Sequence, residues 1–194
     1  MQSTFPTHLG TTQDLREFAQ TRTGKVLLAI SASAFVAICA HVSVPLYFTP
    51  VPVTLQTLAV ILIGLALGPT LGFSAMVLYL AEGAIGLPVF SPHSLGLLGP
   101  TAGYLFSYPI AAAAAGTVVR AIRLGRSRFP AALLGGVAAS VVILSTGAGW
   151  ITLLLHLAPA AAWHMAVAPF LPGEVLKVTA AAAAFTALRR WHRS

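Results

Sequence analysis

The distribution of charged residues constrains this chain more than any other feature of its sequence. Three long tracts contain no Asp, Glu, Lys or Arg, namely residues 26–81, 83–119 and 129–173. A bilayer core of ~30 Å takes ~20 apolar residues per helix, so each tract is long enough for more than one crossing. Because clusters of Pro and Gly divide the tracts, we predict an integral membrane protein with several helices connected by turns.

Composition excludes the other broad classes of protein. Hydrophobic residues make up 57% of the chain and charged residues 8%, whereas ordinary soluble domains are about 25% charged. A soluble globular domain could not hide this much apolar surface, and a disordered chain would need low hydrophobicity and high charge. The formal net charge of +7 would suggest nucleic acid in a soluble protein. Here it fits basic loops of a membrane protein, and we expect no nucleic-acid partner.

The Pro and Gly clusters predict six transmembrane helices, near residues 26–44, 53–68, 71–87, 101–120, 131–156 and 172–190. Lipid offers no hydrogen-bond partners to the backbone, so a helical bundle is the arrangement that these segments permit. The expected fold is all-α, with residues 25–194 as one six-helix domain. Residues 1–24 are expected to form a polar cytoplasmic segment that does not resemble a cleavable signal peptide. Thr12 is a candidate cap for a short helix on the membrane surface.

Basic residues predict the orientation in the membrane. Ten of the 11 Lys and Arg residues lie before the first helix, between the fourth and fifth helices, or after the sixth. The connecting segments on the other side, residues 45–52, 88–100 and 157–171, contain no Lys or Arg. The positive-inside rule then places both termini in the cytoplasm. We therefore expect a multi-pass protein of a bacterial or archaeal-type cell (inner) membrane.

Two acids and one lysine fall within the predicted spans: Glu82, Glu174 and Lys177. Such residues are rare in lipid and mark functional sites. Glu174 and Lys177 are three residues apart, so they share one face near the outer end of the sixth helix. They are interpreted as contacts to a small amphipathic ligand, or else as an ion pair that locks the helix. Glu82 is either a further ligand contact or an interfacial carboxylate.

The uncharged outer segments are interpreted as parts of a binding lid. Prolines stiffen residues 48–56, residues 86–96 form a loop with aromatic and polar groups, and residues 99–104 open the fourth helix. Taken alone, each segment indicates only a helix boundary. Further candidate substrate contacts from these segments are Gln56, Phe90, Ser94, Thr101 and Tyr104.

A stripe of small residues, Ala29, Ser33 and Ala37, runs along the first predicted helix. Such a stripe permits close contact with a helix of the same bundle or with a different subunit. Three common catalytic motifs are absent from the sequence. Gly24 and Lys25 lack the upstream glycine of a phosphate-binding Walker A loop, and neither the metalloprotease motif H-E-x-x-H nor the nucleophile motif G-x-S-x-G occurs. We therefore expect that the protein is not an enzyme, has no ATPase activity of its own, and binds no metal and no cofactor.

Five ordered motifs resemble those of a known family: PVPVTLQT at 50–57, LALGP at 65–69, GAIGLPVF at 83–90, LGPTAGY at 98–104 and PFLPGEVLK at 169–177. This order is similar to that of the BioY family, the biotin-specific S components of energy-coupling factor (ECF) transporters. The resemblance covers about residues 26–190. It implies a six-helix S-component fold that captures biotin at the outer face of the membrane.

The resemblance also implies partners and site residues. Uptake would be powered by a transmembrane coupling subunit and two ATPase subunits, or the chain would act alone as an oligomer. The family's acidic-x-x-Lys motif carries over to Glu174 and Lys177 as ligand contacts, and its outer loop to residues 90–104. The small-residue stripe would meet the coupling subunit. The chain departs from the family in having Glu174 where Asp is usual, and fewer glycines at residues 91–95.

Alternatives remain open at this point. The first is an S component for another vitamin, such as thiamine or riboflavin. An ion-coupled secondary carrier would use Glu82 and Glu174 as proton sites. An intramembrane enzyme is disfavoured because no nucleophile–base pair is evident.

Overall fold

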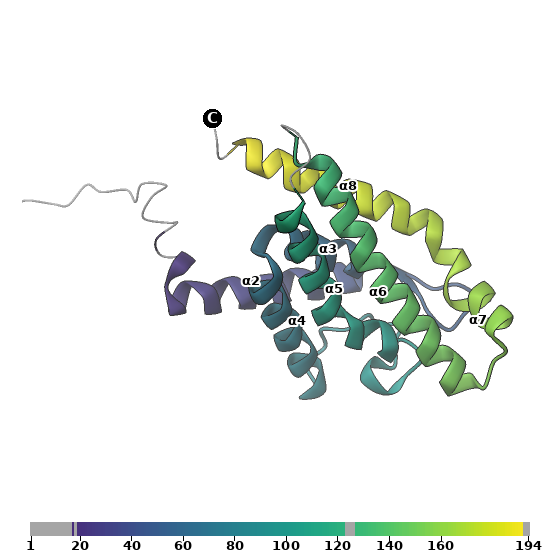
Figure 1. Ribbon diagram of the computed structural model, residues 1–194. Coiled ribbons are helices and arrows are strands. Elements are labelled where there is room, and N and C mark those ends of the chain that lie inside the picture. Colours follow the sequence, from purple (N-terminus) through teal and green to yellow (C-terminus); the bar gives the residue numbers. More distant parts are fainter. Residues whose placement is uncertain (1–16, 18, 123–126, 192–194) are drawn as a thin grey trace, which may run out of the picture.

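The computed structural model describes residues 17, 19–122 and 127–191. The expected surface helix around Thr12 lies outside the described residues. In chain order the elements are α2 (Arg22–His41), β1 (Ser43–Val44), β2 (Val53–Thr54), α3 (Gln56–Leu67), α4 (Pro69–Ala84), η1 (Gly96–Leu98), α5 (Ala102–Ala121), α6 (Phe129–Leu155), α7 (Pro159–Ala166), η2 (Ala168–Phe170) and α8 (Leu171–Trp191) (Figure 1). The predicted helical bundle is confirmed, and each of the six predicted helices has its counterpart.

The first helix begins earlier and ends earlier than predicted. It starts at Arg22 because the Thr21 hydroxyl accepts a hydrogen bond from the Gly24 N–H at 3.0 Å, which caps the helix. It ends at His41, and the next residues pair as strands, with Ser43 opposite Thr54. The prediction of helix up to residue 44 was wrong because backbone groups at this end pair across the loop instead.

Small residues allow the central helices to touch. A Cβ on Gly64 of α3 would lie 2.3 Å from the Ala112 carbonyl oxygen of α5, so the two backbones are in contact. Gly68 then ends α3 with φ +85°, a conformation that other residues rarely adopt, and Pro69 starts α4. Helix α5 consequently lies in the middle of the bundle, packed against α3, α4 and α6.

One helix was missed by the sequence analysis. Residues 157–171 were predicted as an uncharged loop, but they contain α7 and η2. Pro159 occupies the first turn of α7 and alanines follow it, a favourable start for a helix. His156, with φ 51°, ends α6 and turns the chain into this segment. The consequence is that Phe170 is held at the start of α8.

Within the described residues, four stretches are long and apolar enough to cross a membrane: α2, α5, α6 and Pro159–Arg190, which includes α8. Helices α3 and α4 have 12 and 16 residues, about 18 and 24 Å at 1.5 Å per residue, less than a bilayer core. Most residues of α3 are buried, so protein surrounds much of this helix. Because several helices are long and apolar enough to span a bilayer, the chain is a multi-pass membrane protein.

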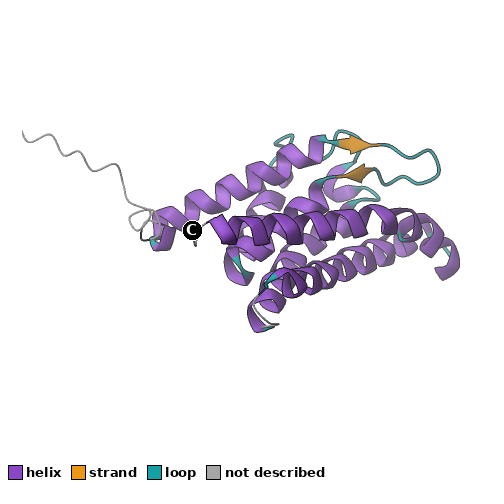
Figure 2. Ribbon diagram, turned by 90° about the horizontal axis from the view of Figure 1, so that it is seen from above, coloured by secondary structure: helices purple, strands orange, loops and turns teal. Residues whose placement is uncertain are grey.

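The bundle has two chemically different ends. The two strands lie opposite the C-terminus (Figure 2). We call the end with β1, β2, α7 and the start of α8 the pocket end. The other end carries the start of α2, the end of α5, the start of α6 and the end of α8. We call it the basic end, because basic residues gather there. Those that the structure describes are Arg22, Lys25, Arg120, Arg128, Arg189 and Arg190.

Candidate functional site: a polar pocket with an aromatic floor

The first two turns of α8 carry a buried ion pair. The Lys177 Nζ atom lies 2.9 Å from the Glu174 Oε1 atom, as the spacing of three residues predicts. Only 5% of Glu174 and 7% of Lys177 is exposed. Glu174 also lies near the helix N-terminus, where the helix dipole favours an anion.

Two further helices supply hydrogen bonds to the same carboxylate. The Thr57 hydroxyl of α3 donates to Glu174 Oε1 and the Ser140 hydroxyl of α6 donates to Oε2, both at 2.8 Å. A buried charge is tolerated only when it is paired and its remaining lone pairs are satisfied. The carboxylate therefore ties α3, α6 and α8 together at this point.

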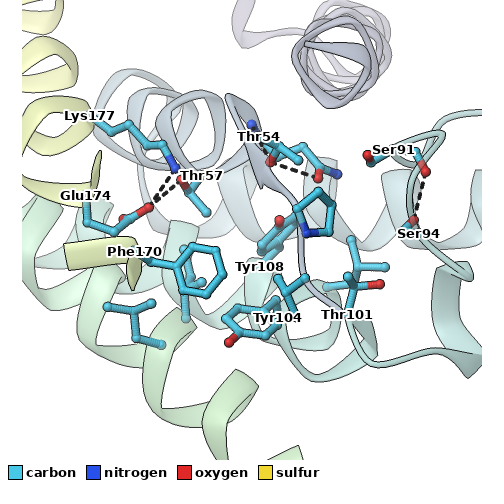
Figure 3. Close-up of a pocket in the computed structure, with 16 residues that line it drawn as sticks. Thr54, Thr57, Ser91, Ser94, Thr101, Tyr104, Tyr108, Phe170, Glu174 and Lys177 are labelled. Atoms are coloured by element: carbon cyan, nitrogen blue, oxygen red, sulfur yellow. Dashed lines mark hydrogen bonds and ion pairs between the residues drawn. The ribbon is translucent and has the colours of Figure 1, made fainter. Parts of the chain in front are cut away.

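Glu174, Lys177 and Thr57 line a pocket between α3, α5, α6, α8 and the segments 51–54 and 91–101, which we call the polar pocket. Its lining residues are Val51, Pro52, Thr54, Gln56, Thr57, Ser91, Ser94, Thr101, Tyr104, Leu105, Tyr108, Ile143, Leu144, Phe170, Glu174 and Lys177. Figure 3 shows Glu174 and Lys177 on one side and Ser91 and Ser94 on the other, with aromatic rings between them. The pocket thus has polar groups on two separated sides, with aromatic rings and Thr54 between them.

A chain of hydrogen bonds supports the wall formed by α3. The Gln56 amide Nε2 donates to the Tyr79 hydroxyl at 2.6 Å, and that hydroxyl donates to the Val89 carbonyl at 2.8 Å. The Thr54 hydroxyl donates to Gln56 Oε1 at 3.2 Å. Through these bonds α4 holds both the start of α3 and the loop that follows Val89.

The remaining walls are also held by single hydrogen bonds. The Tyr104 hydroxyl donates to the Ala166 carbonyl at 2.6 Å, and the Trp150 indole N–H donates to the Gly99 carbonyl at 3.0 Å. The space inside is narrow, about 40 Å³, which is room for a few water molecules. A larger ligand therefore requires the walls to separate.

Six of the eight predicted substrate contacts line the polar pocket: Glu174, Lys177, Tyr104, Ser94, Thr101 and Gln56. Phe90 does not, because its ring packs edge-on against Tyr79, with the centroids 5.3 Å apart. Glu82 does not either, since its Oε2 atom accepts a hydrogen bond from the Ser33 hydroxyl between α4 and α2. The structure thus places neither residue in the lining of the pocket.

The small-residue stripe of α2 faces its own bundle. Ser33 is fully buried and bonded to Glu82, while Ala29 and Ala37 are half-buried against the core. Of the two partners considered for this stripe, a helix of the same chain is the one seen here. A contact with a coupling subunit through these residues stays a prediction.

Sequence reasoning missed several residues of the site. Ser140 does not line the pocket but donates to Glu174, and as a polar residue in an apolar stretch of α6 it gave a usable signal. Tyr108 lies four residues after Tyr104 and therefore on the same face of α5. Thr57 and Phe170 gave no such signal, because their role depends on how α3 and η2 pack against α8.

Comparison with known proteins places the chain among transporters. The model of the BioY family matches residues 11–194. A probable biotin transporter BioY of Pyrococcus horikoshii is 36% identical over 151 residues, covering 76% of this chain and 85% of that protein. The biotin transporter BioY of Rhodobacter capsulatus is also 36% identical, over 167 residues that cover 78% of this chain and 85% of that protein.

A solved structure has the same fold. The crystal structure of an S component for biotin from an ECF-type ABC transporter superposes with a TM-score of 0.78 at 24% identity. The match covers 89% of this chain and 95% of the other. Together with the two relatives and the family match, which extends over nearly the whole chain, this fold shows that the chain belongs to the BioY family.

Proposed function

We propose that the chain binds biotin in the polar pocket and mediates its uptake across the membrane. The supporting observation is the arrangement of two polar places on either side of an aromatic floor. Biotin is polar at its ureido ring and its carboxylate and apolar between them, so its ends match the two places. An apolar pocket with a few fixed polar groups suits such a ligand. The names of the relatives agree with this choice of substrate.

The charges in the pocket favour one orientation of biotin. Lys177 is already paired with Glu174, so a second carboxylate at this place would meet the Glu174 anion. The ureido ring avoids that repulsion, because its N–H groups donate to Glu174 and its carbonyl accepts from Lys177. The carboxylate of biotin then points toward the hydroxyl groups of Ser91, Ser94 and Thr101. We propose this orientation for the bound ligand.

Entry of biotin requires the loops at the pocket end to move. The narrow space is closed by residues 51–54 from the strand connection and by residues 91–101 from the loop before α5. A hydrogen bond 2.9 Å long connects Ser43 to His93 of the second segment. Ser43 belongs to β1, which pairs with β2 at Thr54, so this bond links the loop before α5 to the strand pair. We propose that the bond breaks when biotin enters and re-forms around it.

The first test is titration of the purified full-length chain with biotin, followed by tryptophan fluorescence or calorimetry. We expect saturable binding of one biotin per chain, and no competition by thiamine or riboflavin.

A second test uses biotin methyl ester, which lacks the charge of the biotin carboxylate. It tests the proposed orientation of the ligand independently of the location of the pocket. A Ser94→Ala variant should weaken biotin binding more than ester binding, whereas a Glu174→Gln variant should weaken both equally. The opposite pattern would reverse the orientation, and absence of biotin binding would overturn the function.

We further propose that six helices span the membrane, with the basic end in the cytoplasm and the polar pocket outside. The basic residues at one end support this orientation. The test uses single cysteines in a Cys39→Ser background, at His93 of the pocket end and at Arg190 of the basic end. A maleimide that does not cross membranes should label intact cells at position 93 only. Labelling at position 190 alone would show that the topology is the opposite of the one proposed.

Uptake by this chain is proposed to depend on a coupling subunit and two ATPase subunits, with self-association as the second possibility. The fold of an ECF-type S component supports the first arrangement. Uptake of labelled biotin in cells that express the chain with and without such a module distinguishes the two. Uptake that needs the module and ATP supports the first. Uptake without the module that a protonophore abolishes would instead favour an ion-coupled carrier.

A further inference from the structure

A hollow at the basic end lies far from the polar pocket. It has a volume of about 570 Å³ and is lined by Leu65, Ala66, Val119, Arg120, Arg128, Phe185, Leu188 and Arg189. We call it the basic hollow. The ends of α3, α5 and α8 and the start of α6 surround it, so four helices contribute to one site.

Hydrogen bonds to backbone carbonyls position two of its arginines. The Arg120 Nη2 atom donates to the Leu67 carbonyl at the end of α3, at 3.0 Å. The Arg128 Nη1 atom donates to the Val119 and Ile122 carbonyls at the end of α5, at 3.2 and 3.3 Å. These bonds use one terminal nitrogen of each guanidinium group, which has five N–H donors in all.

The described acidic side chains do not neutralise these two arginines. Among the described residues, neither Arg120 nor Arg128 forms a salt bridge. Glu174 is paired at the pocket end and Glu82 is bonded to Ser33. The basic hollow therefore concentrates positive charge, and an anion is the ligand that this charge favours.

The apolar walls restrict which anion fits. Leu65, Val119 and Phe185 are buried at the floor, and Leu188 is 52% exposed at the rim. Arg189 lies over the Phe185 ring, with its Cζ atom 5.6 Å from the ring centroid. Arginines that only mark the cytoplasmic side need no such walls, because headgroup water would solvate them. A charged group next to an apolar floor suits an amphipathic anion.

We propose that the basic hollow binds an anionic phospholipid of the leaflet at this end. Its phosphate accepts hydrogen bonds from the free guanidinium donors of Arg120 and Arg128, and its acyl chains lie along Leu65 and Leu188. Basic pockets between the ends of transmembrane helices bind anionic headgroups in this way. Because Arg120 bridges to α3 and Arg128 to α5, the bound lipid also fixes the two helix ends.

Native mass spectrometry of the full-length chain with added phosphatidylglycerol or phosphatidylcholine tests the proposal. We expect retained phosphatidylglycerol on the unaltered chain and roughly tenfold weaker binding in an Arg120→Gln, Arg128→Gln double variant, since charge-assisted bonds are lost. The matched control is Arg22→Gln with Arg190→Gln, which removes the same charge from exposed residues outside the hollow. It should bind phosphatidylglycerol as the unaltered chain does.

Three outcomes would overturn the lipid site. Equal losses in the two double variants would indicate general surface charge. Unchanged binding in the Arg120→Gln, Arg128→Gln variant would place the lipid elsewhere. Competition by millimolar inorganic phosphate would indicate a site for a free anion. An Arg120→Lys, Arg128→Lys variant keeps the charge and the fold but loses bidentate hydrogen bonding to the phosphate. We expect its affinity for phosphatidylglycerol to lie between those of the unaltered chain and the Arg→Gln double variant. Circular dichroism and gel filtration check that each variant is folded.

Discussion

The two ends of the bundle hold their charges in opposite ways. At the pocket end, Glu174 and Lys177 are buried, and the carboxylate accepts three hydrogen bonds. At the basic end, Arg120 and Arg128 sit at the rim of an open hollow and donate only to helix carbonyls. A buried charge must find its partners within the protein, whereas an exposed charge is satisfied by water. The pocket end therefore depends on each partner, and the basic end does not.

The largest effect is expected from Lys177→Met. It removes one positive charge and leaves the Glu174 carboxylate buried without its ion pair, a loss of about 3–5 kcal/mol. We expect a lower melting temperature in detergent and biotin binding at least roughly tenfold weaker, since a hydrogen bond to a charged group is lost. Arg190→Met removes the same charge from the basic end and should change neither quantity. Equal effects of both variants would contradict the comparison.

Removal of a single partner should have a smaller effect. Ser140→Ala takes one hydrogen bond from Glu174 and should weaken biotin binding and lower stability by about 1.5–3 kcal/mol, the contribution of a hydrogen bond to a charged group. Ser145→Ala is the matched control, because Ser145 lies on the exposed side of the same helix and bonds to a backbone carbonyl. Denaturation and biotin titration of both variants measure the difference.

The acidic residue at position 174 gives a sharper test. Glu174→Asp keeps the charge but shortens the side chain by one methylene, and it restores the residue usual in the resembled family. We expect the ion pair with Lys177 on α8 to remain. The hydrogen bond from Ser140 on α6 should be lost, because the shorter side chain no longer extends to it. Biotin affinity should then fall severalfold in this chain. A double variant with Ser140→Ala should show no further loss, and an additive loss would argue against this route.

The smallest effect is expected from salt. Raising the ionic strength from 0.1 to 1 M shortens the screening length from about 10 to about 3 Å. The exposed basic end should respond through weaker binding of anionic lipid. Biotin affinity should change little, because the Glu174–Lys177 pair is shielded by protein. A strong salt dependence of biotin binding would show that the pocket pair is solvated in the binding-competent state.

The sequence predicted much of the pocket because its strongest signals are local. Glu174 and Lys177 stand out in an apolar helix at a spacing that places them on one face, and the polar pocket forms around them. Phe90 and Glu82 carried equally visible chemistry but lie beside the pocket. Their direction depends on how α4 packs against α2 and against the following loop, and a single sequence does not specify that packing.

The sequence by itself determined the class of protein and its segments. Long tracts without charge allow only membrane-spanning helices, and Pro, Gly and basic residues mark where these helices end. Only the tertiary structure decided which polar groups meet. Thr57, Ser140 and Glu174 are far apart in the chain, yet three helices bring them together, because a buried carboxylate must be satisfied wherever the packing leaves it. Helix propensity acts within a few residues, whereas this requirement acts across the whole bundle.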